Sequence, residues 1–115
     1  FQPHQAHRTK NLFKEFVSAF GLADYLFLLP IYQVAGRDKP HRGSTSADLA
    51  KAIKTRYSRH SHTFADSHYV TYLPSPHRLP SVIKSIVTRY KLHGTSVVIM
   101  MGAGDIVNYT DSLIK

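Results

Sequence analysis

A glycine turn near the carboxyl end of the chain is the stretch best suited to meet a ligand. The apolar run Val97–Met101 stops at a Gly-Ala-Gly-Asp turn that contains Gly102, Gly104 and Asp105. Such a run predicts a buried parallel strand, and Asp105 is placed to cap a helix over 106–114. Because ligands of parallel sheets bind beyond the carboxyl ends of the strands, these three residues are candidates for an active-site edge. A lone Gly-x-Gly is no dinucleotide fingerprint, and a packed corner without a ligand is the plainer alternative.

Charged side chains follow two other predicted strands at the same edge. His4 and Arg8 follow the first stretch of the chain, and Arg37 and Asp38 lie in the basic loop after the next strand. An arginine can hold a phosphate or carboxylate through two parallel hydrogen bonds, so Arg8 is a candidate substrate-binding residue. The alternative for Arg8 is a plain charge at the start of a helix, a placement that the helix dipole slightly disfavours.

Missing motifs exclude several reaction classes. No cysteine is present, and no Gly-x-x-x-x-Gly-Lys-[Ser/Thr] loop exists to cradle nucleotide phosphates, so the chain is not expected to turn over ATP alone. The histidine pairs His4/His7 and His60/His62 lack the adjacent acid of a zinc hydrolase, so no metal site is predicted. No catalytic residue is assigned.

Helices and strands are predicted to alternate along residues 1–115, which form one domain. This alternation predicts an α/β fold, a Rossmann-like doubly wound, mostly parallel sheet with helices on both faces. Residues 1–4 are expected to be the tail of a first strand whose body is missing. Apolar spacing predicts helices over 9–20 and 46–57, capped by Thr9 and Ser46, and over 79–90 and 106–114, with strands over 25–29, 69–73 and 97–101 and a β-prone stretch at 62–65.

Composition suggests a basic protein with anionic partners. The 115 residues include 15 Lys and Arg against 7 Asp and Glu, a formal charge of +8. The cations are scattered and no aromatic-basic signature appears, so nucleic acid is not the expected partner. No apolar run approaches the ~20 residues of a membrane span, and the lack of cysteine agrees with a cytoplasmic location. Because the chain starts inside a motif and without Met, we expect it to be a piece of something longer.

A set of short motifs along nearly the whole chain resembles the carboxyl-terminal domain of the bacterial UDP-N-acetylmuramate–L-alanine ligases, in the Mur ligase family. The opening and closing motifs are the most specific, and those between them are sparser. The matching residues are Phe1-Gln2-Pro3-His4, Arg8-Thr9, Leu12-Phe13, Phe16, Asp24, Ile31-Tyr32, Ala35-Gly36, Ser46, Leu49-Ala50 and Met101-Gly102-Ala103-Gly104-Asp105-Ile106.

The resemblance implies the third domain of a three-domain ligase of peptidoglycan precursor synthesis. In that family the domain closes over the active site while the other domains bind the sugar nucleotide and, through a phosphate loop, ATP with Mg²⁺. The expected substrates are UDP-N-acetylmuramate, L-alanine and ATP, joined through an acyl phosphate that closure protects from water. By position in the motif, His4 and Arg8 would face the substrate.

One departure from the family pattern bears on activity. The family commonly has Arg directly after Phe-Gln-Pro-His, and this chain has Gln5, which removes a cation from the site. The aromatic residue that commonly follows is also missing at Ala6-His7, and Asp38 is the best match to the acid expected near Ala35-Gly36. The alternative is therefore a non-catalytic Rossmann-like module that binds an anionic ligand or a protein partner.

Overall fold

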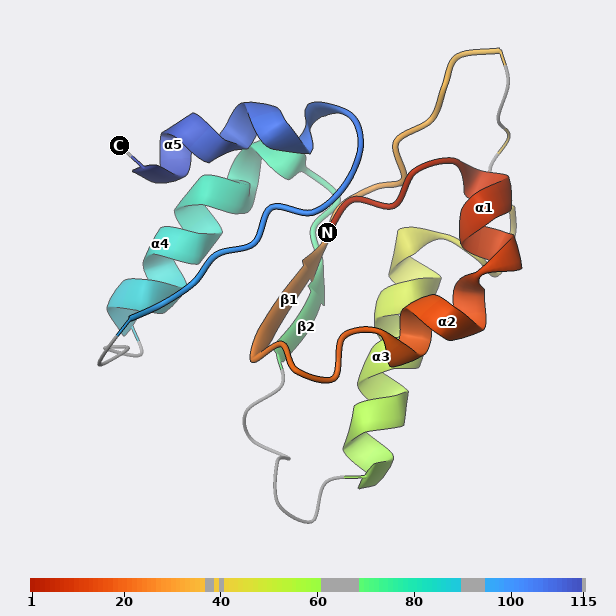
Figure 1. Ribbon diagram of the computed structural model, residues 1–115, viewed down its shortest axis with the longest axis horizontal. Coiled ribbons are helices and arrows are strands. Elements are labelled where there is room, and N and C mark those ends of the chain that lie inside the picture. Colours follow the sequence, from red (N-terminus) through yellow and green to blue (C-terminus); the bar gives the residue numbers. More distant parts are fainter. Residues whose placement is uncertain (37–38, 40, 61–68, 90–94, 115) are drawn as a thin grey trace.

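The computed structural model describes residues 1–36, 39, 41–60, 69–89 and 95–114 (Figure 1). Helices and strands alternate over much of this range, as predicted. None of the helices within it is long and apolar enough to cross a membrane. The elements are α1 (Ala6–Asn11), α2 (Phe13–Ser18), β1 (Tyr25–Leu28), α3 (Ser46–His60), β2 (Tyr69–Tyr72), the 3-10 helix η1 (Pro76–Arg78), α4 (Leu79–Arg89), the 3-10 helix η2 (Asp105–Tyr109) and α5 (Thr110–Ile114).

A small parallel sheet lies at the centre. Strands β1 and β2 pair in parallel, with Tyr25 opposite Tyr69. The first residues of the chain lie along the other side of β1 and its continuation, since the Leu29 amide donates to the Phe1 carbonyl (2.9 Å). A further parallel bridge joins Gln2 to Gly102. Four extended segments therefore lie side by side in the order 101–102, 1–4, β1 and β2.

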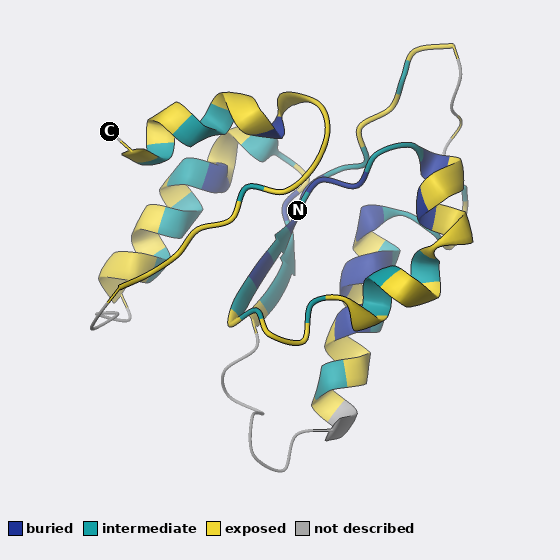
Figure 2. Cartoon of the chain, viewed as in Figure 1, coloured by how far each residue is buried: buried dark blue, intermediate teal, exposed yellow. Residues whose placement is uncertain are grey.

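Helices cover both faces of the sheet, which makes three layers (Figure 1). Successive side chains of a strand point to opposite faces. Leu28 accordingly packs with Leu49 and Ile53 of α3, whereas Leu29 packs with Leu79 of α4 and Ile106 of η2 on the other face. Figure 2 shows the buried positions gathered on β1 and on the side of α3 that faces the sheet. Burial of each such aliphatic side chain stabilises the fold by roughly 1.5–3 kcal/mol.

The first predicted helix, over 9–20, is two helices in the structure. The chain turns sharply at Gln5, with a φ of 64°, and α1 starts directly after it. Thr9 is fully buried inside α1 and its hydroxyl donates to the Gln5 carbonyl, so it is no cap. Leu12 separates α1 from α2 with a non-helical ψ of 22°. The apolar stripe therefore packs against α3 from α2 and Phe20, whereas Leu12 is exposed. Apolar spacing alone does not reveal the break between the two helices.

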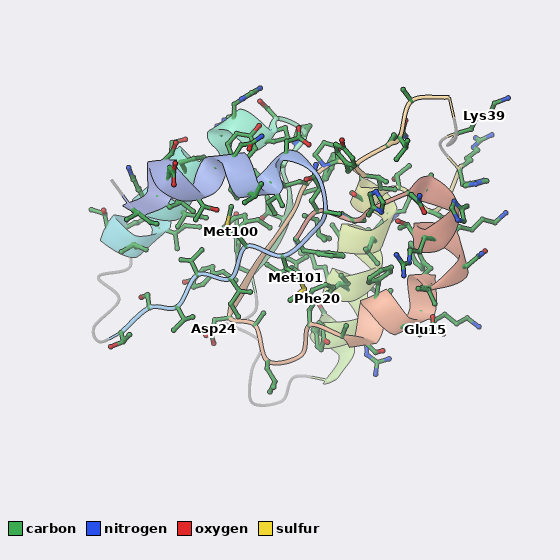
Figure 3. The ribbon with its side chains drawn as sticks, turned by 45° about the horizontal axis from the view of Figure 1, so that its top comes forward. Glu15, Phe20, Asp24, Lys39, Met100 and Met101 are labelled. Carbon is green, nitrogen blue, oxygen red and sulfur yellow. The ribbon has the colours of Figure 1, made fainter. Side chains whose placement is uncertain are left out.

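The prediction of a buried strand over 97–101 is wrong. Val97 is 79% exposed and Ile99 70% exposed. Residues 95–100 form no β-ladder, and the segment bridges its neighbour only where Gly102 meets Gln2. Met100 lies beside α4 and α5, whereas Met101 lies on the side of Phe20 (Figure 3). An apolar run shows what a segment is able to bury, but not whether the chain supplies a neighbour on each side of it.

The helix predicted over 106–114 is a 3-10 helix, η2, followed by the short helix α5. The other elements follow the predictions closely, apart from one cap. Strands β1 and β2 and helix α4 start at the predicted residues. The cap of α3 is Thr45 instead of Ser46, because the hydroxyl of Thr45 accepts the amide N–H of Asp48 and donates to its carboxylate. The β-prone stretch 62–65 lies outside the described residues.

Candidate functional site

The carboxyl end of the first segment is held against the continuation of β1. The His4 ring stacks on Tyr32, with ring centroids 5.7 Å apart and planes at 19°. One residue on, the Gln5 amide donates to the Tyr32 carbonyl (3.0 Å). A positive φ is rare for a residue other than glycine, and such outliers gather at functional sites. The positive φ of Gln5 lets the chain turn at once from this segment into α1.

The glycine turn closes over the same tyrosine. A Cβ atom on Gly104 would clash with the Tyr32 ring, and one on Gly102 would lie 2.6 Å from the Gln2 carbonyl oxygen. Gly104 has a φ of 100°, which side chains disfavour. The two glycines are thus explained by contacts within the protein itself. These contacts bring the turn beside His4 and Tyr32, as the strand-edge argument predicts.

Gln2 links the first segment to the last helices. Its side chain is 4% exposed and its Oε1 accepts the buried N–H of Ile106 (3.1 Å). The predicted cap at Asp105 is therefore wrong: Gly104 occupies the cap position, Asp105 is the first residue of η2, and no side chain of the cap residue bonds to the helix. The side-chain amide of Gln2 binds the N–H of Ile106 at the start of the helix instead, because the first segment pairs with the turn at Gly102.

The other predicted site residues are less closely joined to this cluster. Arg8 lies one helical turn beyond His4, with an exposed side chain on α1. Asp105 is exposed at the start of η2. Arg37 and Asp38 lie outside the described residues. The structure thus brings together His4, Gly102 and Gly104, with Arg8 on the adjoining helix.

Sequence reasoning gave no site role to Tyr32 or Gln2. Tyr32 follows Pro30, just beyond the strand predicted over 25–29, and it is named only among the residues that carry the family resemblance. Its position at the carboxyl end of that run is the signal that could have identified it, because ligand-facing residues follow the strands of parallel sheets. Gln2 contacts Ile106 across almost the whole chain, and no local pattern predicts such a contact.

The chemistry that this edge supports is binding of an anion. An imidazole and a guanidinium are hydrogen-bond donors suited to phosphate or carboxylate, and Tyr32 offers an aromatic surface that is 36% exposed. Within the described ranges, no three His, Cys, Asp or Glu residues gather as a metal site would require. The arrangement is suited to holding an anionic group, through the His4 imidazole and the Arg8 guanidinium.

Comparison with known proteins gives a consistent answer along the chain. This chain is 33% identical over 114 residues to the UDP-N-acetylmuramate–L-alanine ligase of Desulfatibacillum aliphaticivorans. The match covers 99% of this chain and 22% of that protein. The ligases of the same name from Trichlorobacter lovleyi and Geotalea uraniireducens are 35% and 36% identical over 115 residues, with 100% of this chain and 22% of each relative aligned. This chain is a distant homologue of part of these ligases. It spans about a fifth of their length, and no protein-family model matches it.

Proposed function

We propose that this chain is part of an ATP-dependent ligase that joins L-alanine to UDP-N-acetylmuramate in peptidoglycan precursor synthesis. The observation that carries the proposal is the similarity to ligases of that name over 99–100% of the chain. His4 and Arg8 at the strand edge support it, because UDP-N-acetylmuramate and L-alanine carry carboxylates, and the sugar nucleotide and ATP carry phosphates. A ligase that uses these metabolites works in the cytoplasm.

We further propose that residues 1–115 are the carboxyl-terminal, closing domain of this ligase. The order of the four extended segments supports a doubly wound, Rossmann-like sheet, because it matches the strand order 3-2-1-4 of that fold, in which the fourth strand lies beside the first. Residues 1–4 are then the tail of the first strand.

His4 and Arg8 are the proposed substrate-binding residues. In doubly wound sheets the ligand lies where neighbouring strands send their connections to opposite faces. Here α1 follows the first segment on the α3 side, and η2 follows the last segment on the α4 side. Gly102, Gly104 and Asp105 border this edge, and Arg37 and Asp38 are assigned to it from the sequence alone. Closure would bring these groups to the phosphates and exclude water.

The residues of this chain do not themselves fit a magnesium–nucleotide site. The sequence has no phosphate loop, and the described residues include no acidic or histidine cluster that would hold a metal ion. We therefore assign ATP and Mg²⁺ to the rest of the parent enzyme, and we derive no step through them here.

The test is product formation by the full-length protein that carries this chain. Incubated with UDP-N-acetylmuramate, L-alanine, ATP and Mg²⁺, it should yield UDP-N-acetylmuramoyl-L-alanine, detected by mass spectrometry. The 115-residue chain alone should yield none. Product from the short chain would refute the assignment of ATP and Mg²⁺ to other domains. A folded full-length protein without product would refute the ligase.

Gln5 favours one second candidate function, a non-catalytic module that binds an anionic ligand or a protein partner. The residue lacks the positive charge that ligases commonly have at this position, while the stacked edge of His4 and Tyr32 is retained. A full-length protein that binds UDP-N-acetylmuramate in a calorimetric titration but forms no product would support this module.

A further inference from the structure

A groove separates α4 from the sheet on the face opposite α3. Its volume is about 440 Å³, within the ~300–1,000 Å³ of small-molecule sites. One wall comes from β1 and β2 and includes Tyr25, Phe27 and Tyr69, and the other is the facing side of η1 and α4. The groove thus lies between the sheet and a helix, whereas the cluster of His4 and Tyr32 lies at the carboxyl ends of the strands.

The sheet wall is aromatic. The parallel register places Tyr25 opposite Tyr69, with ring centroids 6.0 Å apart, and Phe27 lies 6.4 Å from the same Tyr69 ring. Tyr69 is nevertheless 51% exposed. A large ring that remains half exposed beside two others provides a surface on which a flat ligand can stack.

The helix wall is cationic and rich in hydroxyl groups. Arg78, Ser85 and Arg89 all line the groove, and their spacing places them along one side of η1 and α4. The two arginines lie about 16 Å apart, by the rise of about 1.5 Å per helical residue. None of the described lining residues is Asp or Glu, so an anion meets no opposing carboxylate in this wall. A guanidinium beside a serine hydroxyl is well suited to a phosphate monoester.

The end of the groove where β1 and β2 begin combines the aromatic wall with the cationic wall. Helix α4 follows β2 and runs back against the strands, so Arg89 at its end lies toward Tyr25 and Tyr69, where the strands begin. Arg78 lies at the other end of the groove, toward Leu73. We propose that this groove binds a nucleoside phosphate, whose base stacks on Tyr69 and whose phosphate meets Arg89 and Ser85.

The test is a titration of the ¹⁵N-labelled 115-residue protein, followed by amide NMR shifts. Adenosine 5′-monophosphate should shift the signals of Tyr69, Ser85 and Arg89. Inorganic phosphate alone and adenosine alone should each bind at least ten-fold more weakly, because each engages only one wall. Shifts centred on His4 and Tyr32 instead would overturn the proposal, as would equal affinity for phosphate and the nucleotide.

Variants distinguish binding in the groove from attraction of the nucleotide by the net positive charge of the protein. Arg89→Gln and Tyr69→Leu should each weaken binding of adenosine 5′-monophosphate at least five-fold. Both side chains are exposed, so the amide spectra should stay those of the folded protein. Lys54→Gln, an exposed cation on α3, is the matched control and should leave affinity unchanged. An equal loss in Lys54→Gln would mean that the net charge of +8 alone attracts the nucleotide. The outcome does not depend on ligase activity, since no ligase substrate pair is present.

Discussion

Individual backbone conformations hold the candidate site in place. Gln5 and Gly104 both have positive φ angles, and both contact Tyr32, one through its carbonyl and the other through its ring. The requirement for glycine at 104 has two parts, the backbone angle and the lack of space for a Cβ atom. Gly36 also has a positive φ, 76°, but a Cβ atom there would meet no atom within 4 Å. Only the backbone angle therefore favours glycine at position 36.

Gly104→Ala should therefore destabilise the protein more than Gly36→Ala. Both variants strain the backbone by roughly 1–3 kcal/mol, and only the first also forces Tyr32 to move. The free energy of unfolding from urea titration measures the difference. Equal losses would show that Tyr32 yields freely and does not fix the turn.

Arg8→Ala should reduce the ligase activity of the full-length protein at least ten-fold, because the guanidinium is proposed to hold an anionic substrate group. Lys51→Ala, an exposed cation on α3, is the control and should leave activity within two-fold of the original. The measurement is kcat/KM for L-alanine and for UDP-N-acetylmuramate. Small and equal effects of both variants would remove Arg8 from the site.

Among the elements, α3 shows how a helix start is fixed by reciprocal bonds. The Asp48 amide donates to the Thr45 hydroxyl (3.2 Å), and the Thr45 amide donates back to the Asp48 carboxylate (3.0 Å), which also accepts from the Thr45 hydroxyl (2.6 Å). This is the arrangement of a capping box. Ser46, one residue on, is 3% exposed, and its hydroxyl has no hydrogen-bond partner among the described residues.

Thr45→Ala should cost about 1 kcal/mol of unfolding free energy, the usual effect of a lost helix cap. Ser46→Ala should cost little or stabilise slightly, because it removes a buried hydroxyl that makes no bond. Chemical denaturation of the two variants gives the comparison. A larger loss for Ser46→Ala would return the cap to the residue that the sequence suggested.

The same cap makes stability depend on pH. The hydrogen bonds from the side chain and backbone of Thr45 lower the pKa of Asp48. Folding thus favours the carboxylate, and this stabilisation is present above its unfolded pKa of about 3.9 and is lost as pH falls through the lower folded value. Asp48→Asn should therefore destabilise the protein more at pH 6 than at pH 3. In a Thr45→Ala background this difference should shrink, and an undiminished difference would assign the pH dependence to another group.

Local patterns identified those elements that carry a continuous apolar run or an apolar stripe of their own. The apolar runs that became β1 and β2, and the stripe of α4, were placed nearly to the residue. The prediction of one helix over 9–20 missed the break at Leu12, because apolar spacing continues through it. The apolar sequence of 97–101 predicts a core strand. Sequence alone does not show that the segment beside it, residues 1–4, bridges it only at Gln2.

For the whole molecule, the strand-edge rule predicted that His4 and the glycine turn lie at one edge, but not which contacts join them. It placed His4 and the glycine turn together at the carboxyl edge, and the structure joins them through Tyr32. It did not predict Gln2, whose bond to Ile106 spans nearly the entire chain. Long-range polar contacts of this kind depend on the complete packing of layers, which a local pattern does not contain.

The ligase proposed above would need ATP, L-alanine and UDP-N-acetylmuramate together. The most direct measurement is phosphate release from ATP by the full-length protein, with L-alanine or UDP-N-acetylmuramate omitted in turn. We predict release only when both are present, which would also make Gln5 a harmless variation. No release from the folded protein with all substrates present would contradict the proposed ligase activity, and Gln5→Arg would then be the first variant to make.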